Sequence, residues 1–382
     1  MITTINNKHN KLNVPNLRFP EFQGEWKVES IKDVADFMGG GTPSSSNESF
    51  WQGTIPWVSS SDIVENDIKN ISISRYITEE AIAHSATKLC PAPSILIVSR
   101  VGVGKIALSK EAICTSQDFC NLINIKVEPI FLTYCLSQIM KRKSMEVQGT
   151  SIKGITTSEI QKISINIPSL REQKKIGKIL SLLDERIATQ NKIIDKLQSL
   201  IKGIRNDIFG KLRKNIGFIA VVGDVLDYEQ PQPYIVENTE YTAEGIPVLT
   251  ANKAFILGYT SETNGIYDKG DCIIFDDFTL DCKYVDFPFK VKSSAIKILT
   301  AKNKELLRYT FEFLKYLDLS TEEHKRHYIA ETQNQGIILP TEQMVKTIAH
   351  IFSTLSLRME TAVKQRNVFE KQKQYLLRQM FI

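Results

Sequence analysis

The 382-residue sequence lacks the patterns of a membrane or secreted protein. No stretch approaches the ~18 uninterrupted apolar residues of a membrane-spanning helix, and the opening residues MITTINNKHNKLN hold no apolar run of a signal peptide. The six cysteines show no CxxC pairing and no nearby HxxxH, so we expect buried, reduced thiols and no zinc site or disulfide. They are Cys90, Cys114, Cys120, Cys135, Cys272 and Cys282. These absences predict a cytoplasmic protein.

Complete motifs for nucleotide and methyl-group chemistry are also missing. Phe37-Met-Gly-Gly-Gly41 matches the FxGxG pattern with which amino-methyltransferases approach S-adenosylmethionine, but no [Asn/Asp]-Pro-Pro-[Tyr/Phe] loop follows. We expect instead a turn before Pro43 that needs glycine conformations. Gly102-Val-Gly-Lys105 lacks the first glycine and the Ser or Thr of a P-loop, so we expect a turn at the end of a strand.

One set of residues resembles a metal-dependent nuclease. Asp271 together with Asp281-Cys-Lys283 could supply two carboxylates that hold magnesium and a lysine that assists the attacking water. Asp-x-Lys triplets are common by chance. A nuclease hypothesis predicts magnesium-dependent cutting by this chain alone, and we assign no catalytic residue and no metal ligand from the sequence.

What the sequence does contain is a long internal repeat. The segment from Pro168 to Phe209 recurs without a gap as the segment from Pro340 to Phe381, which aligns Ile176 with Ile348 and Leu183 with Leu355. A chain that alternates block, helix, block, helix is a tandem duplication.

Each copy of the repeat carries an apolar stripe whose members advance by steps of four and three residues. The stripe is typical of a coiled-coil seam, so we expect the two helices, ~60 Å long if each has ~40 residues, to pack as an antiparallel coiled coil with approximate twofold symmetry. The expected seam residues are Ile176, Leu180, Leu183, Ile187, Ile194, Leu197, Ile201, Ile348, Phe352, Leu355, Met359, Phe369 and Leu376. Gln190, Arg366 and Lys373 interrupt the stripe, and each cation either is buried and fixes the register or extends to the surface.

The two blocks between the repeats are less periodic. Both have strands first and then a helix, an order that favours α+β domains. We expect strands at 94–98, 122–127, 270–275, 287–291 and 295–299, and helices at 130–145 and 304–317. The predicted organisation is a first globular domain over 1–167, a helix over 168–213, a second globular domain over 214–339 and a C-terminal helix over 340–382.

Short motifs across these blocks resemble the specificity subunits of type I restriction-modification enzymes. They are Pro15-Asn-Leu-Arg-Phe-Pro-Glu-Phe22, Gly24-Glu-Trp26, the Gly-Gly-Gly-Thr-Pro43 loop, Trp51, Ile55-Pro-Trp57, Gly149-Thr-Ser-Ile-Lys-Gly-Ile155, Ile167-Pro168 and Glu172-Gln173. In the second block, Tyr228-Glu-Gln-Pro231, Tyr234-Ile-Val236, Phe275-Asp-Asp-Phe-Thr279 and His324-Lys-Arg-His327 resemble one variant of that family's second target-recognition domain.

The resemblance implies a noncatalytic subunit that recognises a bipartite double-stranded DNA target, one half-site with each block. It also implies two methyltransferase subunits that modify adenine N6 and, in the full complex, two ATP-driven restriction subunits as partners. S-adenosylmethionine, ATP and magnesium are then expected on those partners and no cofactor on this chain. The alternative hypothesis is a coiled-coil adaptor with two protein-binding heads.

Base recognition restricts the candidate DNA contacts to certain side chains. Arg or Lys can bond guanine, Asn or Gln can bond adenine, and Ser or Thr can serve several base edges, although each candidate can equally be a solvated loop residue. The candidates are Thr42, Ser44, Ser59, Ser60, Arg100, Lys105, Gln117, Gln148, Lys153, Gln230, Gln232, Tyr234, Asn252, Lys253, Lys292, Lys325, Arg326 and Gln333. His324 and His327 have metal-like spacing, but the adjoining Lys325 and Arg326 favour phosphate contact.

Charge is unevenly distributed along the chain. The formal net charge is +5, yet the basic excess lies in the repeat segments, and residues 214–340 hold more acidic than basic side chains. The globular blocks alone therefore do not predict strong phosphate affinity, and we expect partner subunits to contribute to DNA binding. The target bases themselves cannot be derived from the sequence.

Overall fold

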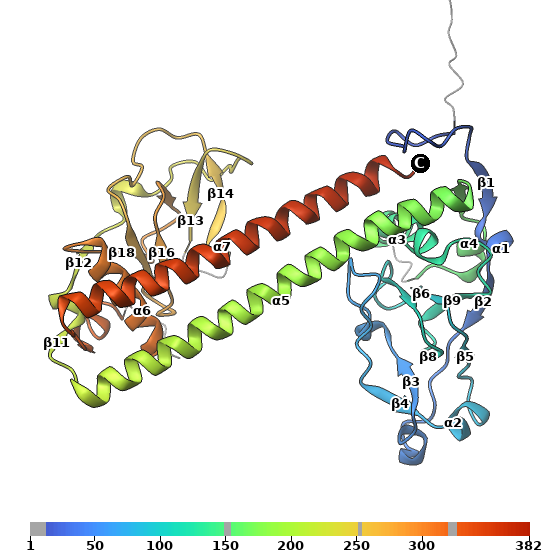
Figure 1. Ribbon diagram of the computed structural model, residues 1–382, viewed down its shortest axis with the longest axis horizontal. Helices are drawn as coiled ribbons and strands as arrows, with labels where there is room; N and C mark the ends of the chain where they lie inside the picture. Colours follow the sequence, from blue (N-terminus) through green and yellow to red (C-terminus); the bar gives the residue numbers. More distant parts are fainter. Residues whose placement is uncertain (1–12, 149–153, 251–253, 320–326) are drawn as a thin grey trace, which may run out of the picture. The chain divides into compact units, whose positions relative to one another are not determined.

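The computed structural model describes residues 13–148, 154–250, 254–319 and 327–382 (Figure 1). Contacts divide the chain into two compact units: unit 1 comprises residues 1–189 and 365–382, and unit 2 comprises residues 190–364. Two long helices, α5 (Leu170–Asn215) and α7 (Glu342–Gln379), each contribute a segment to both units. The mixed α+β fold with two domains and long repeat helices is thereby confirmed, whereas the four boundaries predicted from the sequence remain a prediction.

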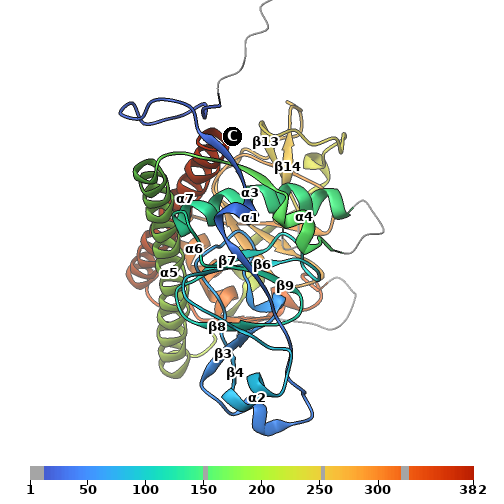
Figure 2. The ribbon, with the colours of Figure 1, turned by 90° about the vertical axis from the view of Figure 1, so that its right-hand side faces the viewer.

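Unit 1 is built on two four-stranded sheets, with strand orders β2-β9-β6-β7 and β4-β3-β8-β5, and the two-stranded ribbon β1-β10. Helix α3 packs against β6 and β7, while β3, β4 and α2 lie away from it (Figures 1 and 2). The strands are β1 (Lys27–Ser30), β2 (Asp36–Gly39), β3 (Ile55–Val58), β4 (Arg75–Ile77), β5 (Leu89–Cys90), β6 (Ser94–Val98), β7 (Ile106–Ser109), β8 (Ile113–Thr115), β9 (Phe119–Ile123) and β10 (Ser164–Ile167). The helices are α1 (Ile31–Val34), α2 (Glu79–Ala83), α3 (Pro129–Gln148) and α4 (Thr157–Gln161), with short 3₁₀ turns η1 (Glu48–Trp51) and η2 (Ser60–Asp62).

Unit 2 repeats this topology, except that its second sheet has three strands. Its sheets have the orders β12-β18-β15-β16 and β14-β13-β17, again with a two-stranded ribbon, β11-β19, and a helix, α6, against the larger sheet. The strands are β11 (Ala220–Val221), β12 (Leu226–Glu229), β13 (Ile246–Leu249), β14 (Ile256–Thr260), β15 (Cys272–Asp276), β16 (Cys282–Val285), β17 (Lys290–Val291), β18 (Ile296–Ala301) and β19 (Gly336–Ile337). Helix α6 (Lys304–Leu317) is joined by the turns η3 (Val222–Asp224), η4 (Gln232–Tyr234) and η5 (Thr332–Asn334). The duplication seen in the helices therefore extends to the globular blocks, whose loops conceal it in the sequence.

The long helices enter the two cores with opposite ends. In unit 1, Ile176 and Leu180 of α5 share a core with Leu377 and Met380 of α7. In unit 2, Ile201, Phe209 and Leu212 of α5 share a core with Val345, Ile348 and Phe352 of α7. The early part of α5 thus meets the late part of α7, and the late part of α5 meets the early part of α7, which is the order of an antiparallel pair. All expected seam residues are buried or half-buried.

Local chemistry explains where the predicted elements agree with the structure and where they differ. The expected elements at 94–98 and 304–317 match β6 and α6, and Asn303 caps α6 by accepting a hydrogen bond from the Leu306 amide at 2.8 Å. The strand expected at 122–127 stops at Ile123 because Asn124 adopts φ 50°, outside the β region. The strand expected at 287–291 is reduced to Lys290–Val291.

The glycine run at 39–41 has a different role from the one expected. None of its glycines adopts positive φ, so the prediction of a turn that needs glycine conformations is wrong. A Cβ added to Gly40 would lie 2.1 Å from the Ser116 carbonyl oxygen, and one added to Gly41 would lie 2.4 Å from Ala86. Glycine is required here because backbones pass too close for a side chain. The turn expected at Gly102–Lys105 is confirmed, with Gly102 at φ 91° and Gly104 at φ 103°.

Candidate nucleic-acid interface

The polar loops of unit 1 meet at one edge of its sheets. Strands β3 and β8 are parallel, so their carboxyl ends coincide, and the Ser116 amide donates to the Val58 carbonyl at 2.9 Å. The Gly41 amide donates to Thr115 at 2.8 Å, and the Ser99 amide donates to Asp118 at 2.8 Å. We call the resulting group of loops, 40–47, 59–62, 99–105 and 116–118, the loop edge of unit 1.

Side chains predicted as DNA contacts join these loops to one another. The Thr42 hydroxyl donates to Gln117 Oε1 at 2.5 Å, and the Lys105 ammonium donates to the Ser60 carbonyl at 3.1 Å. Thr42, Ser44, Arg100 and Gln117 are exposed, whereas Ser59, Ser60 and Lys105 are half-buried. The edge therefore presents hydroxyl, amide and cationic groups on a backbone that the sheets hold in place.

Two tryptophans fix the loop that carries Ser44. The Trp57 indole N–H donates to the Gly41 carbonyl at 2.9 Å, and the Trp51 indole N–H donates to the Ser44 carbonyl at 3.1 Å. Their rings pack edge to face with centroids 5.1 Å apart. Both indoles thereby help to position the backbone of this loop.

Arg75 is a residue of this edge that the sequence did not single out. Its guanidinium donates to Ser59 Oγ at 2.6 Å, pairs with Asp62 and lies 4.5 Å from the centroid of the Trp57 ring. Partial burial would raise the pKa of Asp62, but hydrogen bonds from Ser59 and the charge of Arg75 outweigh it and lower that pKa. No spacing motif marks Arg75, because only the pairing of β3 with β4 brings it to Ser59.

Unit 2 gathers its loops in the corresponding place. The Lys292 amide donates to Leu249 at 2.9 Å, the Asp277 amide donates to Ala295 at 3.1 Å, and the His327 amide donates to the Asp277 carbonyl at 3.1 Å. The turn at 230–234 joins them, since the Val236 amide donates to Val291 at 2.9 Å. We call the loops 230–234, 249–250, 277–281 and 292–295 the loop edge of unit 2.

The candidates of unit 2 differ in how accessible they are. Gln230, Gln232 and Lys292 are exposed. Tyr234 lies in the core at 7% exposure, where its hydroxyl donates to Glu229 at 2.6 Å and its ring packs on Tyr267, so the structure does not present it on the surface. Gln333 donates to the Ile329 carbonyl at 2.7 Å within the turn after His327.

Several predicted contacts fall outside the part of the chain that the structure describes. Lys153, Asn252, Lys253, Lys325, Arg326 and His324 lie outside the described residues, as does the side chain of Gln148. The loop 278–280, between β15 and β16, was missed as a candidate, although Phe278 is 37% exposed. Only the topological match between β6–β7 and β15–β16 identifies it as the counterpart of the loop at 100–105.

The two nuclease-like carboxylates are not brought together, although Lys283 pairs with Asp281 at 3.0 Å. In the β15–β16 hairpin Cys272 pairs with Val285 and Phe275 with Cys282, so Asp271 and Asp281 stand at opposite ends, ~10 Å or more apart. Asp271 binds Lys304 at 2.9 Å, and Asp281 binds Lys315 at 2.8 Å. Within the described part of the chain no group of three His, Cys, Asp or Glu residues could hold a metal ion. The geometry therefore gives the nuclease hypothesis no support.

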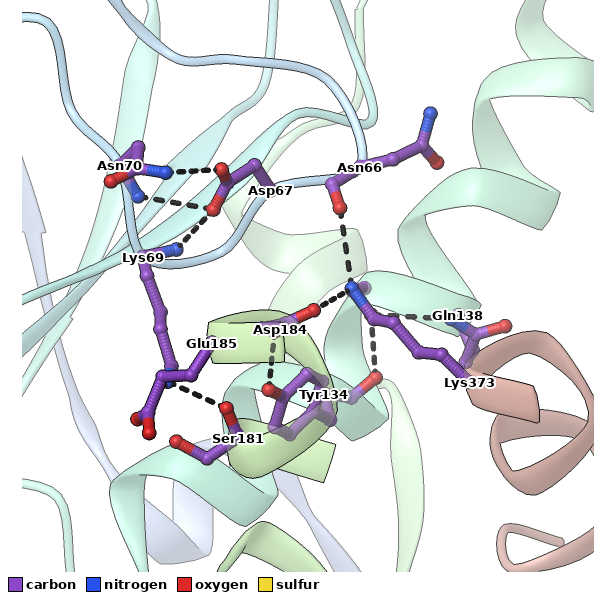
Figure 3. Close-up of polar contacts among 11 residues, drawn as sticks. Asn66, Asp67, Lys69, Asn70, Tyr134, Gln138, Ser181, Asp184, Glu185 and Lys373 are labelled. Atoms are coloured by element: carbon purple, nitrogen blue, oxygen red, sulfur yellow. Dashed lines mark hydrogen bonds and ion pairs between the residues drawn. The ribbon is translucent and has the colours of Figure 1, made fainter. Parts of the chain in front are cut away.

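A polar cluster in unit 1 joins α5 and α7 to the globular block (Figure 3). Asp184 of α5 accepts hydrogen bonds from the Tyr134 hydroxyl of α3 and from Lys373 of α7, both at 2.5 Å. Burial first, and then the charge of Asp184, raise the pKa of Tyr134, which stays a neutral donor. Lys69 donates to the Ser181 carbonyl of α5 at 3.0 Å, so the strand-linking loop at 66–70 rests on the same helix.

Of the three residues that interrupt the seam, Lys373 is therefore buried in this cluster, at 8% exposure. Arg366 is half-buried and bonds Asn367 at 2.9 Å on its own helix, and Gln190 is half-buried.

Among the helices described, none combines the length and the apolar character that a membrane crossing demands.

Comparisons with known proteins agree with this architecture. A family model described as "Type I restriction modification DNA specificity domain" matches residues 23–199. The Escherichia coli type I restriction enzyme EcoR124I/EcoR124II specificity subunit is 47% identical over 126 residues, which cover 31% of this chain and 31% of that protein. The Methanocaldococcus jannaschii type I restriction enzyme MjaIX specificity subunit is 33% identical over 224 residues, which cover 56% of this chain and 50% of that protein.

The matches thus span 31% and 50% of the length of these two relatives.

A solved structure resembles nearly the whole chain. The type I restriction-modification system S subunit from M. genitalium superposes with a TM-score of 0.71 at 17% identity, covering 97% of this chain and 99% of that one. At this identity the likeness concerns the fold.

Proposed function

We propose that this chain is a type I restriction-modification specificity subunit and acts as the noncatalytic DNA-recognition subunit of its complex, which its similarity to named specificity subunits supports. Each unit contacts one half of a bipartite double-stranded target through its loop edge. The long helices hold two methyltransferase subunits that act on adenine N6, and two restriction subunits join the full complex. S-adenosylmethionine, ATP and magnesium belong to those partners.

The observation that carries the proposal is the duplicated loop edge. In both units, loops at the same edge of equivalent sheets carry hydroxyl, amide and cationic side chains that are able to bond base edges or phosphates. The scaffold beneath is shared, whereas the loop residues differ, as expected for two modules that recognise different half-sites.

A block exchange tests this division. Residues 1–167 are replaced by the matching block of a relative with another target, and the methylated motif of a host carrying the chain and its methyltransferase partner is sequenced. We expect one half of the motif to change and the other to persist. A motif altered in both halves would contradict the proposal, as would methyl transfer by the rigorously purified chain without its partner.

We further propose that the helices set the spacing between half-sites, with half-site centres about one DNA turn, ~10 bp, apart. Both α5 and α7 run unbroken across the residues at which the two units meet in sequence, 189–190 and 364–365. Inserting one heptad at each of these points preserves the phase of the seam. The expected result is a longer spacer between unchanged half-sites, and an unchanged spacer in an active variant would remove this proposal.

The position of the insertion matters. A site after Gly210, which the repeat alone would suggest, lies inside α5 between Phe209 and Leu212, and both of these are buried in the core of unit 2. An insertion there would displace packed side chains and confound spacing with folding. Insertion at 189–190 and 364–365 avoids the core of either unit.

A further inference from the structure

A charged pair lies buried beneath the loop edge of unit 2. Asp277, the first residue after β15, is 1% exposed, and Lys297 of β18 is 4% exposed. Their charged groups are 3.2 Å apart, and the Lys297 ammonium also lies 5.2 Å from the centroid of the Tyr228 ring. A buried carboxylate and ammonium each require such partners, because an isolated buried charge is strongly unfavourable.

The carboxylate also holds a second segment of the chain. Asp277 Oδ1 accepts hydrogen bonds from the backbone amides of His327 at 3.1 Å and Tyr328 at 2.9 Å, and the Asp277 carbonyl accepts from the His327 amide. The segment that begins at His327 is therefore bonded to the loop after β15. In the sequence, Lys325 and Arg326 directly precede it, although they lie outside the described residues.

The neighbouring Asp276 has a separate task. Its Oδ1 accepts the Phe278 amide at 2.9 Å, and its Oδ2 accepts the Thr279 hydroxyl at 2.7 Å, which orders the turn that presents Phe278 and Thr279. The two adjacent acids thus act on different sides: Asp276 shapes its own loop, and Asp277 fixes the segment beside it.

Unit 1 shows that the fold itself does not need this carboxylate. Ser99 follows β6 as Asp277 follows β15, and the Ile155 amide donates to the Ser99 carbonyl at 2.8 Å, as the His327 amide does to Asp277. The Ser99 hydroxyl donates to the Asp118 carbonyl at 3.0 Å. The backbone bond is common to both units, and the buried ion pair is an addition made only in unit 2.

We propose that Asp277, held by Lys297, is a positioning residue for DNA recognition by unit 2. It sets the place of the segment starting at His327 against the loop 278–280, so that side chains on both segments approach the same half-site in a fixed geometry. A buried ion pair adds little net stability compared with an apolar pair of the same volume, whereas removal of one partner alone is strongly destabilising. Thermal unfolding of each variant is therefore measured beside its discrimination between bases. The inference rests on the proposed function.

The test uses the chain in complex with its methyltransferase subunits. Methylation rates are measured on the wild-type motif and on duplexes with single base-pair changes in either half, after block exchange has assigned the halves to the units. The variants are Asp277→Asn, Asp277→Ser, which installs the residue of unit 1, and Lys297→Met. Asp268→Asn is the matched control, because Asp268 is an exposed acid of the same unit.

We expect Asp277→Asn and Lys297→Met to reduce discrimination at the half-site of unit 2 by about 10-fold or more, the scale of one base-specific contact. Discrimination at the other half-site and the behaviour of Asp268→Asn stay at wild-type levels. We expect the double variant Asp277→Asn/Lys297→Met to reduce discrimination no further than either single variant, because both residues act through the same ion pair.

Two results would overturn the inference. Discrimination could fall equally at both half-sites, or it could persist in Asp277→Asn; if it persisted while thermal unfolding shifted, the pair would have a purely structural role. Asp277→Ser keeps the question answerable if Asp277→Asn does not fold. A wild-type complex that methylates no bipartite motif would instead refute the proposed function, and this inference with it.

Discussion

The two units attach to the same pair of helices through different polar chemistry. In unit 1 the carboxylate sits on the repeat helix, as Asp184 of α5, and it binds Tyr134 of α3 and Lys373 of α7. In unit 2 the carboxylate sits on the helix of the globular block, as Glu312 of α6, and it binds Arg205 of α5 at 2.7 Å and Arg308 at 2.8 Å. Arg308 also reaches the Phe352 carbonyl of α7 at 3.2 Å.

This difference shows which part of the duplication was kept. In the repeat, Asp184 aligns with Ser356, whose hydroxyl accepts a hydrogen bond from Arg308, and Lys373 aligns with Ile201. The charged residues of one unit therefore have no charged counterpart in the other. The apolar seam is shared because any well-packed apolar side chain fills it. A polar contact between three helices requires only that each buried charge has an opposite charge or a hydrogen-bond partner, and each unit supplies these from different positions.

The largest effect is expected from breaking the link in unit 2. Glu312→Ala leaves Arg205 and Arg308 facing each other without their carboxylate, where Glu312 is 1% and Arg308 9% exposed. Removal of one partner from a buried pair costs about 3–5 kcal/mol. Urea unfolding followed by circular dichroism should show that loss. The control variant Glu305→Gln, which changes an exposed acid of the same helix, should keep the wild-type stability.

The same experiment can locate the effect. All three tryptophans, Trp26, Trp51 and Trp57, lie in unit 1, so tryptophan fluorescence follows that unit alone. A Glu312→Ala transition displaced by circular dichroism but little changed by fluorescence would support separate links. A free energy of unfolding within about 0.5 kcal/mol of wild type would show that the network adds no net stability, which is common for surface ion pairs.

Breaking the link in unit 1 is expected to cost less. Lys373→Met removes the ammonium, but Asp184 keeps the Tyr134 hydroxyl and is 12% exposed, so we expect a loss of about 1–3 kcal/mol. The change should appear in tryptophan fluorescence. Lys371→Met, at an exposed position of the same helix, is the control.

A double-mutant cycle with Asp184→Asn isolates the pairwise term. Coupling between Lys373 and Asp184 of about 0.5 kcal/mol or more is expected, because the two groups touch. Additive effects would mean that Lys373 stabilises the unit through packing of its alkyl chain.

These contrasts also show what the sequence could and could not predict. The seam, α6 and β6 follow from apolar periodicity, which survives without knowledge of partners. Whether the Lys373 side chain is buried or exposed could not be derived from the sequence, because its burial depends on Tyr134 and Asp184 from two other helices. Arg75 and the loop 278–280 were missed for the same reason, since strand pairing and not spacing brings them to the loop edges. Tyr234 has a side chain suited to base contact, yet packing against Tyr267 places it in the core.

The glycines of unit 1 offer a third test of similar size, directed at its loop edge. Gly40→Ala places a Cβ against the Ser116 carbonyl and Thr115, whereas nothing lies within 4 Å of a Cβ at Gly39. Overpacking of this kind costs about 1–3 kcal/mol, and Gly39→Ala should be close to neutral. Unfolding by tryptophan fluorescence compares the two variants. If both were neutral, the backbone at Gly40 would have room to shift, and the glycine would not be needed for close approach.

The smallest effect concerns Asp62, the acid at the loop edge of unit 1. Hydrogen bonds from Ser59 and the charge of Arg75 overcome partial burial and lower its pKa in the folded state. A carboxyl with a lowered folded pKa stabilises the protein above its ordinary pKa of about 4, and that contribution is lost as the pH falls through the folded value. Asp62→Asn should therefore cost about 1 kcal/mol at pH 7, and the difference from wild type should shrink as the pH falls below about 4. A difference that stayed constant from pH 7 down to about pH 2 would show that the stabilisation does not depend on the charge of Asp62.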